Sequence, residues 1–373
     1  MTEWLLILAR NRASDADLQY TLQMYNDALI LVEDLCLTIA NKALAQLGIT
    51  APNRSAMDVR DHELQREQQY DCNELRAFIQ ANITKLNIQQ KNAYDKIIRA
   101  VDNNADGFYF LDAPGGTGKT FLISLILATI RSQQKIVLAI ASSGIADTLL
   151  DGDRTAHSAL KLALNIQVVE TPTCNISRNS TMAKVLRGVG IVLWDECPMA
   201  NKKLLEAFNR TMQDLRQKQQ LFGGALVLLS GDFRQTLSVI PRSTPPDEIN
   251  VCLKSSVLWR HVQRLTLTIN MRVQLQNDRS AAAFSKQLLD IGEGKIPIDD
   301  TGLITLPNNF CTLLQSKEEL IESVFPNIVQ HYQRHDYLSE RAILEPKNVH
   351  VNEINFSSQE KLPGEATTYM YID

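Results

Sequence analysis

The stretch APGGTGKT, residues 113–120, decides the fold of this chain. Its three glycines permit a turn whose backbone N–H groups all point at one anion. In such a loop the Lys119 ammonium reaches the β- and γ-phosphates of a nucleotide, and the Thr120 hydroxyl coordinates Mg²⁺. The residues that we expect to contact the nucleotide here are Gly115, Gly116, Thr117, Gly118, Lys119 and Thr120.

The segments around this loop have the pattern of a βαβ unit. A helical pattern at 90–101 and a short apolar run, Phe108–Leu111, precede the loop. A helical pattern at Phe121–Ile130 follows, and a second strand-like run, Ile136–Ile140, completes the unit. This order implies a parallel sheet covered on both faces. A glycine-rich turn that arose by chance would lack this context, so we predict an α/β fold of the P-loop NTPase class.

Two further strand-like runs end in polar turns, which is where the chemistry of an open α/β sheet lies. IVLWDE, residues 191–196, ends in Asp195, placed to hold Mg²⁺, and Glu196, placed to polarise the attacking water. LVLLSGDFR, residues 226–234, is followed by Gln235, whose amide can touch a γ-phosphate. Such turns are common after core strands, so the preceding phosphate loop is what favours these roles.

The tripeptide NMR at 270–272 is too short to be a motif by itself. An arginine that reaches a nucleotide from a neighbouring domain stabilises the charge on the transferred phosphoryl group. A lone arginine is more often a solvated surface residue. The order of the motifs favours the first interpretation for Arg272.

The bulk properties agree with a soluble globular protein. Of the 373 residues, 45% are hydrophobic and 21% charged, and the length allows two or three domains. The net charge of −4 does not favour a nucleic-acid binder, but it leaves room for a local basic groove. The six cysteines form no C-x-x-C pair, so we expect reduced thiols. No signal peptide and no membrane span is expected.

The pattern of apolar and polar residues divides the chain into three regions. Residues 1–85 are predicted to be a helical N-terminal arm and linker, since apolar residues recur at helical spacing between Leu22 and Leu47 and Gly48 suits a stop. Residues 86–261 form the predicted ATPase domain. Residues 262–373 contain helical patterns at 281–291 and 317–332 and a strand-like run at 342–344.

Together these motifs resemble the petite-integration-frequency family of superfamily 1B DNA helicases, and above all its branch carried by Helitron-type transposable elements. The resemblance covers residues 68–373 in unbroken order. The segments that carry it are LNIQQ (86–90), APGGTGKT (113–120), ASSGIADTLL to DRTAHS (141–158), WDECPM (194–199), GDFRQ (231–235), NMR (270–272), LLDIGEGK (288–295) and RAILEPKNVHVNEIN (341–355).

The resemblance implies a RecA-like ATPase domain, part of a second RecA-like domain, and ATP-dependent 5′-to-3′ DNA unwinding with Mg²⁺. By position, Gln90 would read the adenine, Gln235 would sense the γ-phosphate and Arg272 would be an arginine finger. The residues that match DNA-contacting segments are Ser142, Ser143, Thr155 and His157. For His157 a purely structural role is the alternative.

The sequence departs from the family pattern in three places. Ala113 replaces a glycine, Ser238 stands where proline is usual, and the chain stops at Asp373, before the later motifs with the second catalytic arginine. We therefore expect a C-terminally truncated helicase, and a fragment that binds ATP or DNA without completing the cycle is the alternative. A P-loop ATPase or kinase unrelated to DNA is a third interpretation, against which the long match at 141–158 argues.

The resemblance also implies partners and a cellular setting. The expected partners are ATP and single-stranded and forked DNA, with the protein acting as a monomer. In a eukaryote the expected compartment is the nucleus, with the mitochondrion as the alternative. The processes implied are DNA repair, recombination, telomere maintenance or transposition, by analogy of fold and motif alone.

Overall fold

The computed structural model describes residues 22, 25–26, 29–30, 32–33, 36, 43–53, 67, 69–144, 154–162, 166, 169–235, 238, 240, 244–276, 279–306, 310–345 and 347–364. The chain divides into two compact units, residues 1–293 and 294–373. The segment from 262 to 293 therefore lies within the first unit. The predicted boundary between two RecA-like domains near Val262 stays a prediction.

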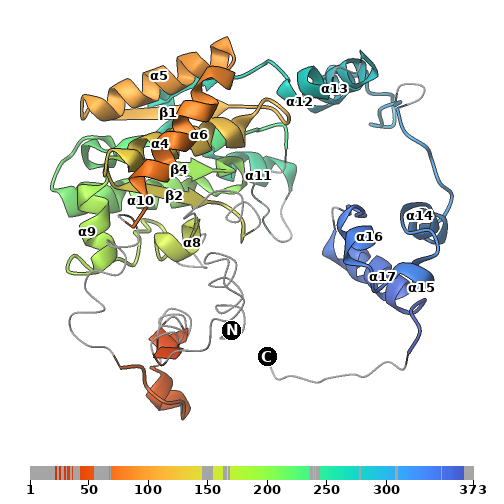
Figure 1. The fold of residues 1–373 in the computed structure, drawn as a ribbon, viewed down its shortest axis with the longest axis horizontal. Coiled ribbons are helices and arrows are strands. Elements are labelled where there is room, and N and C mark those ends of the chain that lie inside the picture. The colour runs from red at the N-terminus through yellow and green to blue at the C-terminus, as the bar shows by residue number, and fades with distance from the viewer. Residues whose placement is uncertain are drawn as a thin grey trace. The chain divides into compact units, whose positions relative to one another are not determined.

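A parallel sheet of six strands forms the centre of the first unit (Figure 1). The strands are β1 Gly107–Asp112, β2 Val137–Ala141, β3 Arg154–Thr155, β4 Ile191–Asp195, β5 Leu226–Gly231 and β6 Gln263–Thr266. Their spatial order is β3-β2-β4-β5-β1-β6, and every neighbouring pair is parallel. The residues of β2, β4 and β5 are all buried, which explains their nearly continuous apolar sequences.

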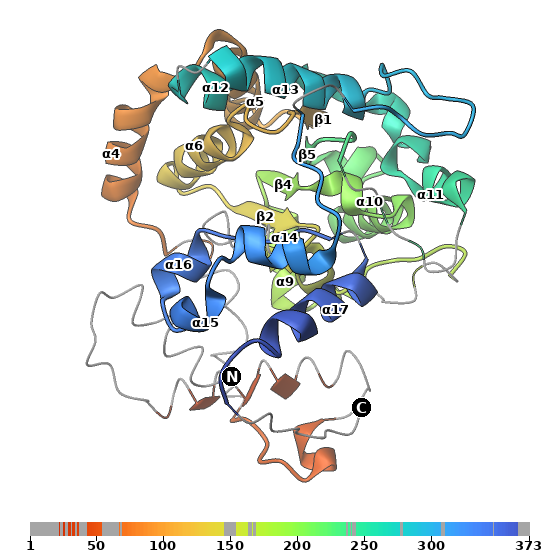
Figure 2. The ribbon, with the colours of Figure 1, turned by 90° about the vertical axis from the view of Figure 1, so that its right-hand side faces the viewer.

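Helices cover both faces of this sheet. Figure 2 shows α5 (Ile88–Asp102) and α6 (Lys119–Ser132) on one side and α9 (Thr181–Gly188) and α10 (Lys202–Arg216) on the other. Each side has its own apolar layer, one containing Ile97 of α5 and the other Phe208 of α10. The predicted α/β P-loop fold is confirmed, and it follows from apolar side chains that alternate between the two faces of each strand.

The described part of the first unit contains five further helices. They are α4 Cys72–Asn82, which packs against α6, α8 Ala156–Ala159, α11 Pro245–Val251, α12 Met271–Gln276 and α13 Arg279–Gly292. Single 3₁₀ turns are η1 Leu44–Leu47, η2 Ile83–Lys85, η3 Cys197–Met199, η4 Leu221–Gly224, η5 Leu253–Ser255 and η6 Trp259–His261. The helical patterns predicted at 90–101, 121–130 and 281–291 correspond to α5, α6 and α13.

The N-terminal arm is described only in part. Its described apolar positions, Leu22, Tyr25, Leu29, Val32 and Cys36, are helical. Gly48 adopts φ 74°, the left-handed conformation that ends a helical turn. Ile39, most of the predicted linker (residues 54–66 and 68) and residues 145–153 lie outside the described residues.

The second unit contains α14 Lys317–Val324, α15 Ile328–His331, α16 His335–Ser339 and α17 Asn348–Gln359. The prediction of one helix over 317–332 is wrong, because Pro326 interrupts the pattern and Asn327 adopts φ 56°. The strand predicted at 342–344 is also wrong. These residues have no strand pairing in the described part of the chain, where a strand needs a neighbour for its backbone groups.

Among the described residues, no helix has the length and apolar character required to cross a membrane.

Candidate nucleotide site

The phosphate loop connects β1 to α6 at the carboxyl edge of the sheet. Gly116 has φ 84° and Gly118 has φ 77°, so both use backbone conformations that favour glycine. A Cβ atom on Gly116 would lie 2.6 Å from Asn270 Oδ1, and one on Gly118 would lie 2.6 Å from Gln90 Nε2. The hydroxyl of buried Thr117 donates to the Pro114 carbonyl at 2.7 Å and braces the turn. The loop is therefore packed from outside as well as shaped to face an anion.

Three predicted site residues meet beside this loop. Lys119 Nζ lies 2.5 Å from Asp195 Oδ1 and 2.5 Å from Glu196 Oε1. Burial alone lowers the pKa of Lys119, but attraction and hydrogen bonds from the two carboxylates outweigh it and raise the pKa above its usual value. Lys119 is therefore a cation held on the acidic pair, half-buried in the first turn of α6, where Thr120 also lies.

Asp195 is held in one orientation by three donors on a single oxygen. Besides Lys119, its Oδ1 accepts from the Glu196 backbone N–H at 2.8 Å and from the Ser230 hydroxyl at 2.7 Å. Ser230 is fully buried at the end of β5. This arrangement leaves Oδ2 of Asp195 for a further ligand. Ser230 is not among the predicted site residues, although a polar residue at the end of the apolar run LVLLS indicates a position at the edge of the sheet.

The turn that carries Glu196 packs tightly on the turn after β5. Glu196 itself adopts φ 47° and ψ 37°, a left-handed conformation that is uncommon for a side chain other than glycine. A Cβ atom on Gly231 would lie 2.4 Å from Cδ of Pro198. The Pro198 ring thus leaves no room for a side chain at position 231. The turns of the WDECP and GDFRQ segments pack directly against each other.

Gln90 lies in the first turn of α5, and its side chain contacts the phosphate loop. Its Nε2 donates to the Thr117 carbonyl at 2.9 Å, and its Oε1 accepts from the Asn87 backbone N–H at 3.0 Å. The side chain is only 1% exposed. In this structure Gln90 therefore braces the loop, with both ends of its amide bonded within the chain.

Arg272 contacts the loop through its backbone, and Gln235 lies in the turn after β5. The Arg272 backbone N–H donates to the Gly116 carbonyl at 3.1 Å, while its side chain is exposed. Gln235 is also exposed, and its Nε2 lies 3.4 Å from Asp232 Oδ2. Because β5 lies between β4 and β1, the turn with Gln235 lies between the acidic pair and the phosphate loop.

The residues predicted to touch DNA lie at the other end of the same sheet edge. The Ser142 N–H donates to the Asp195 carbonyl at 3.2 Å, and its hydroxyl accepts from Trp194 Nε1 at 3.0 Å. Half-buried Ser143 follows it. Thr155 on β3 pairs with Ala141 of β2 and caps α8, on which His157 is exposed. Although the residue as a whole is exposed, neighbouring atoms partly desolvate its ring, which lowers the pKa of His157 below its usual value, so the ring is mostly neutral at pH 7.

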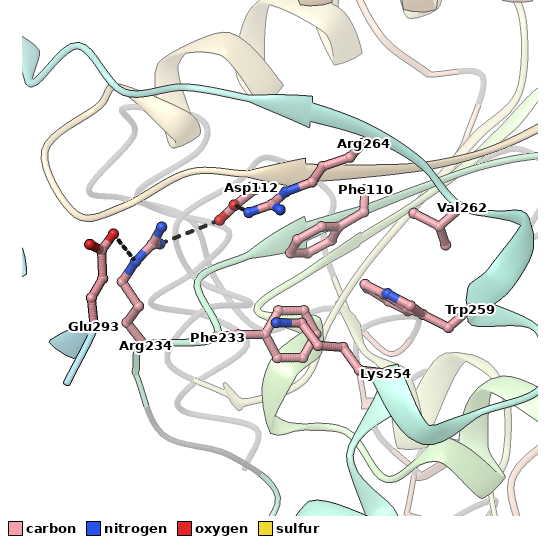
Figure 3. Close-up of a pocket in the computed structure, with 9 residues that line it drawn as sticks. All are labelled: Phe110, Asp112, Phe233, Arg234, Lys254, Trp259, Val262, Arg264 and Glu293. Atoms are coloured by element: carbon pink, nitrogen blue, oxygen red, sulfur yellow. Dashed lines mark hydrogen bonds and ion pairs between the residues drawn. The ribbon is translucent and has the colours of Figure 1, made fainter. Parts of the chain in front are cut away.

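A cavity of about 380 Å³ lies next to β1 (Figure 3). It lies on the face of the sheet opposite to the face that α5 and α6 cover. Its apolar wall is made by the rings of Phe110, Phe233 and Trp259, whose centroids are 5.2 to 5.4 Å apart. Its charged wall is centred on buried Asp112, the residue before the loop, which pairs with Arg234 and Arg264. Three cations (Arg234, Lys254 and Arg264) and two carboxylates (Asp112 and Glu293) line the cavity, so its lining carries one net positive charge.

Arg234 joins three elements at this wall. Its guanidinium lies 2.7 Å from Asp232 Oδ1. It also lies 3.4 Å from Asp112 Oδ1 and 3.4 Å from Glu293 Oε1 (Figure 3). These carboxylates belong to the turn after β5, the end of β1 and the residue that follows α13. Arg234 thereby connects Asp112, the residue before the phosphate loop, to Glu293, the last residue of the first unit.

Comparison with known proteins agrees with this geometry. A sequence profile described as PIF1-like helicase matches residues 85–302, more than half of the chain. The chain is 26% identical over 263 residues to an ATP-dependent DNA helicase Pif1 of Psychrobacter sp. strain PRwf-1, covering 70% of this chain and 36% of that protein. It is 28% identical over 228 residues to an ATP-dependent DNA helicase PIF1 of Candida albicans, covering 60% of this chain and 24% of that protein.

A solved structure extends the comparison to the fold. The Pif1 helicase from Candida albicans superposes with a TM-score of 0.51 at 20% identity, over 75% of this chain and 55% of that one. The chain thus spans only about a quarter to a third of the length of the two relatives named above. With the profile covering the phosphate loop, the acidic pair and the segment of Arg272 in one continuous match, this chain belongs to the PIF1-like helicase family.

Proposed function

We propose that this chain carries the ATP-binding core of an ATP-dependent DNA helicase that couples hydrolysis to 5′-to-3′ movement along single-stranded DNA. The observation that supports this most is the meeting of Lys119, Asp195 and Glu196 at the carboxyl edge of a parallel sheet. The family membership supports it too, since both sequence relatives are named ATP-dependent DNA helicases.

Mg²⁺ fits the residues at this edge. The described residues contain no group of three or more His, Cys, Asp or Glu side chains that would hold a metal by themselves. Magnesium at nucleotide sites commonly uses one or two carboxylates together with waters and phosphate oxygens. Asp195 Oδ2 and the Thr120 hydroxyl would supply the protein ligands. The ion would neutralise charge on the triphosphate, and Lys119 would then leave the acidic pair for the β- and γ-phosphates.

The remaining roles follow from where each side chain lies. Glu196 would polarise the attacking water, since its carboxylate is released when Lys119 turns to the phosphates. Gln235 would sense the γ-phosphate from the turn after β5, the strand that lies between β4 and β1. Arg272 would reach the same phosphate from a segment already bonded to Gly116. For Gln90 to read the adenine, its amide would have to give up one of its two present bonds.

A DNA strand would lie over the ends of β2 and β3. Hydroxyl groups and backbone N–H groups suit phosphate and sugar contacts, which carry no sequence preference. Ser142, Ser143, Thr155 and His157 would provide them. Single-stranded and forked DNA as substrates, action as a monomer and a nuclear location belong to the same proposal.

The test is ATP hydrolysis by residues 1–373 with and without single-stranded DNA. We expect DNA to stimulate turnover, and Lys119→Ala to reduce it by about 100-fold or more, as loss of a group that stabilises transition-state charge does. Lys218→Ala, which removes an exposed lysine far along the chain, is the matched control. Equal turnover in wild type and Lys119→Ala would contradict the proposal.

The same experiment separates the second candidate, a fragment that binds nucleotide without completing the cycle. Because the chain spans only about a quarter to a third of the length of the two relatives, nucleotide binding and turnover by this chain are tested separately. It predicts binding of Mg·ADP with negligible hydrolysis. Hydrolysis that DNA does not stimulate would instead favour a P-loop ATPase unrelated to DNA.

A further inference from the structure

The segment that carries Arg272 is bonded to the first turn of α5. Residues 267–270 connect β6 to α12. The side-chain amide of Gln89 makes three hydrogen bonds to this connection. Its Oε1 accepts the backbone N–H groups of Thr268, at 2.8 Å, and Ile269, at 3.2 Å, and its Nε2 donates to the Thr268 hydroxyl at 2.7 Å. One side chain thus satisfies two backbone groups of the connection.

The same segment also contacts the phosphate loop. Asn270 lies against Gly116, so close that a Cβ atom there would meet its Oδ1 at 2.6 Å. The backbone N–H of Arg272 donates to the Gly116 carbonyl at 3.1 Å. Asn270 Oδ1 accepts from Val273 at 3.2 Å at the start of α12, and its Nδ2 donates to Ser285 of α13 at 2.7 Å. The start of α12 is thereby fixed from three sides.

Neighbouring glutamines on α5 therefore have complementary contacts. Gln90 bonds the Thr117 carbonyl of the phosphate loop, and Gln89 bonds the connection that leads to Arg272. Both start from a turn that is itself capped, since Asn87 Oδ1 accepts the N–H groups of Gln89 and Gln90. The first turn of α5 is a common support for the loop and for the arginine.

We propose that Gln89 is a positioning residue for the phosphoryl-transfer step: it holds the segment of Arg272 on the phosphate loop, so that the guanidinium is presented to the γ-phosphate. This inference rests on the proposed function, because it needs Arg272 to act on a bound nucleotide. Gln89 touches no nucleotide in this scheme and acts only through Arg272.

The effect should appear in the transition state and not in ground-state binding. Displacement of a reacting group by about 1 Å can cost up to about 100-fold in rate, so a loosened support for Arg272 should cost about tenfold. ADP has no γ-phosphate for Arg272 to meet. Gln89→Ala should therefore weaken the binding of Mg·ADP·aluminium fluoride about tenfold and leave that of Mg·ADP within about twofold.

The experiment measures both affinities by titration calorimetry on residues 1–373, which avoids any need for turnover. Gln89→Glu keeps the acceptor for the two backbone N–H groups, and the Thr268 hydroxyl can donate to it, so this variant should retain most of the affinity. Gln80→Ala removes an exposed glutamine from α4 and is the matched control. In an Arg272→Ala background, Gln89→Ala should have no further effect on either affinity.

Three results would overturn the inference. Equal weakening of both ligands by Gln89→Ala would show a structural role only. A full effect of Gln89→Ala in the Arg272→Ala background would show that the two residues act separately. Wild-type protein that binds Mg·ADP·aluminium fluoride no better than Mg·ADP would remove the role of Arg272. Failure of wild type to bind Mg·ADP at all would instead refute the proposed function itself.

Discussion

At the scale of single residues, the contact between Gly231 and Pro198 yields a stability prediction. Gly231 has φ 150°, and a Cβ atom would lie 2.4 Å from a carbon of a rigid ring. Gly231→Ala should lower the free energy of unfolding by ~2–3 kcal/mol through overpacking and backbone strain. Urea unfolding followed by tryptophan fluorescence measures it.

The control for this prediction is Gly190→Ala, because a Cβ atom there would lie 3.5 Å from its nearest neighbour, an ordinary contact. Pro198→Ala should relieve part of the cost of Gly231→Ala, since the collision is with the proline ring. If the effects of the two substitutions on the free energy of unfolding are additive, Gly231 and the Pro198 ring do not pack against each other.

Ser230 gives a second residue-scale prediction, about the metal. Its hydroxyl is one of three donors that orient Asp195. Ser230→Ala should raise the Mg²⁺ concentration for half-maximal nucleotide binding about fivefold, because a net hydrogen bond contributes ~1 kcal/mol. ADP binding in EDTA is the internal control and should not change. An unchanged Mg²⁺ requirement would mean that the Glu196 N–H orients Asp195 without the Ser230 hydroxyl.

His157 gives a prediction about pH. Partial burial lowers its pKa below the usual value, so the ring is mostly neutral at pH 7 and gains its proton as the pH falls. If His157 lies against a DNA phosphate, acid should strengthen single-strand binding through a charge-assisted bond, about threefold more in wild type than in His157→Gln between pH 7.5 and 5.5. Identical pH profiles for the two proteins would favour the structural alternative.

At the scale of elements, Arg234 connects β1, the turn after β5 and the end of α13. Partly exposed ion pairs contribute ~0.2–1 kcal/mol each, so the loss of this junction should free the end of α13 without unfolding the sheet. Arg234→Ala should speed amide hydrogen exchange over 285–293 about threefold to fivefold. Glu293→Gln should speed amide hydrogen exchange over 285–293 and leave the exchange of residues 231–235 unchanged. Faster exchange across the whole sheet in either variant would contradict this prediction.

The elements that the sequence predicted well are those buried on both faces. β1, β2, β4 and β5 are nearly continuous apolar runs, and α6 follows a glycine-rich loop with one known geometry. β6 reads QRLT and is mostly exposed at the sheet edge, so it carries no apolar signal. Pro326 separates α14 from α15, because proline has no backbone N–H to continue a helix. The run AIL at 342–344 has apolar residues but no neighbouring strand.

The site divides in the same way. The phosphate loop and the acidic pair are local sequences, so their residues could be named before the structure. Gln89 and Thr268 are 179 positions apart, and Ser230 and Asp195 are 35 apart. Such partnerships depend on which strands become neighbours and on how a side chain is oriented, and no spacing rule within one segment encodes either.

At the scale of the whole molecule, the division at residue 293 predicts what can be removed. The hydrogen-bond partners of Lys119, Asp195 and the phosphate loop described above belong to the first unit, and so does the segment of Arg272. Removal of residues 294–373 should therefore leave the affinity for Mg·ADP within about twofold, since a site keeps its binding energy when its contacting groups and their supports are intact.

Affinity measured on 1–293 and on 1–373 checks this, with Lys119→Ala in both lengths as the control for specific binding. A shorter chain ending at 261 should lose far more, because it lacks β6 and the Asn270–Arg272 segment that packs on Gly116. If 1–293 bound Mg·ADP as poorly as 1–261, the second unit would have to support the loop directly, and the nucleotide site would not be a property of the first unit alone.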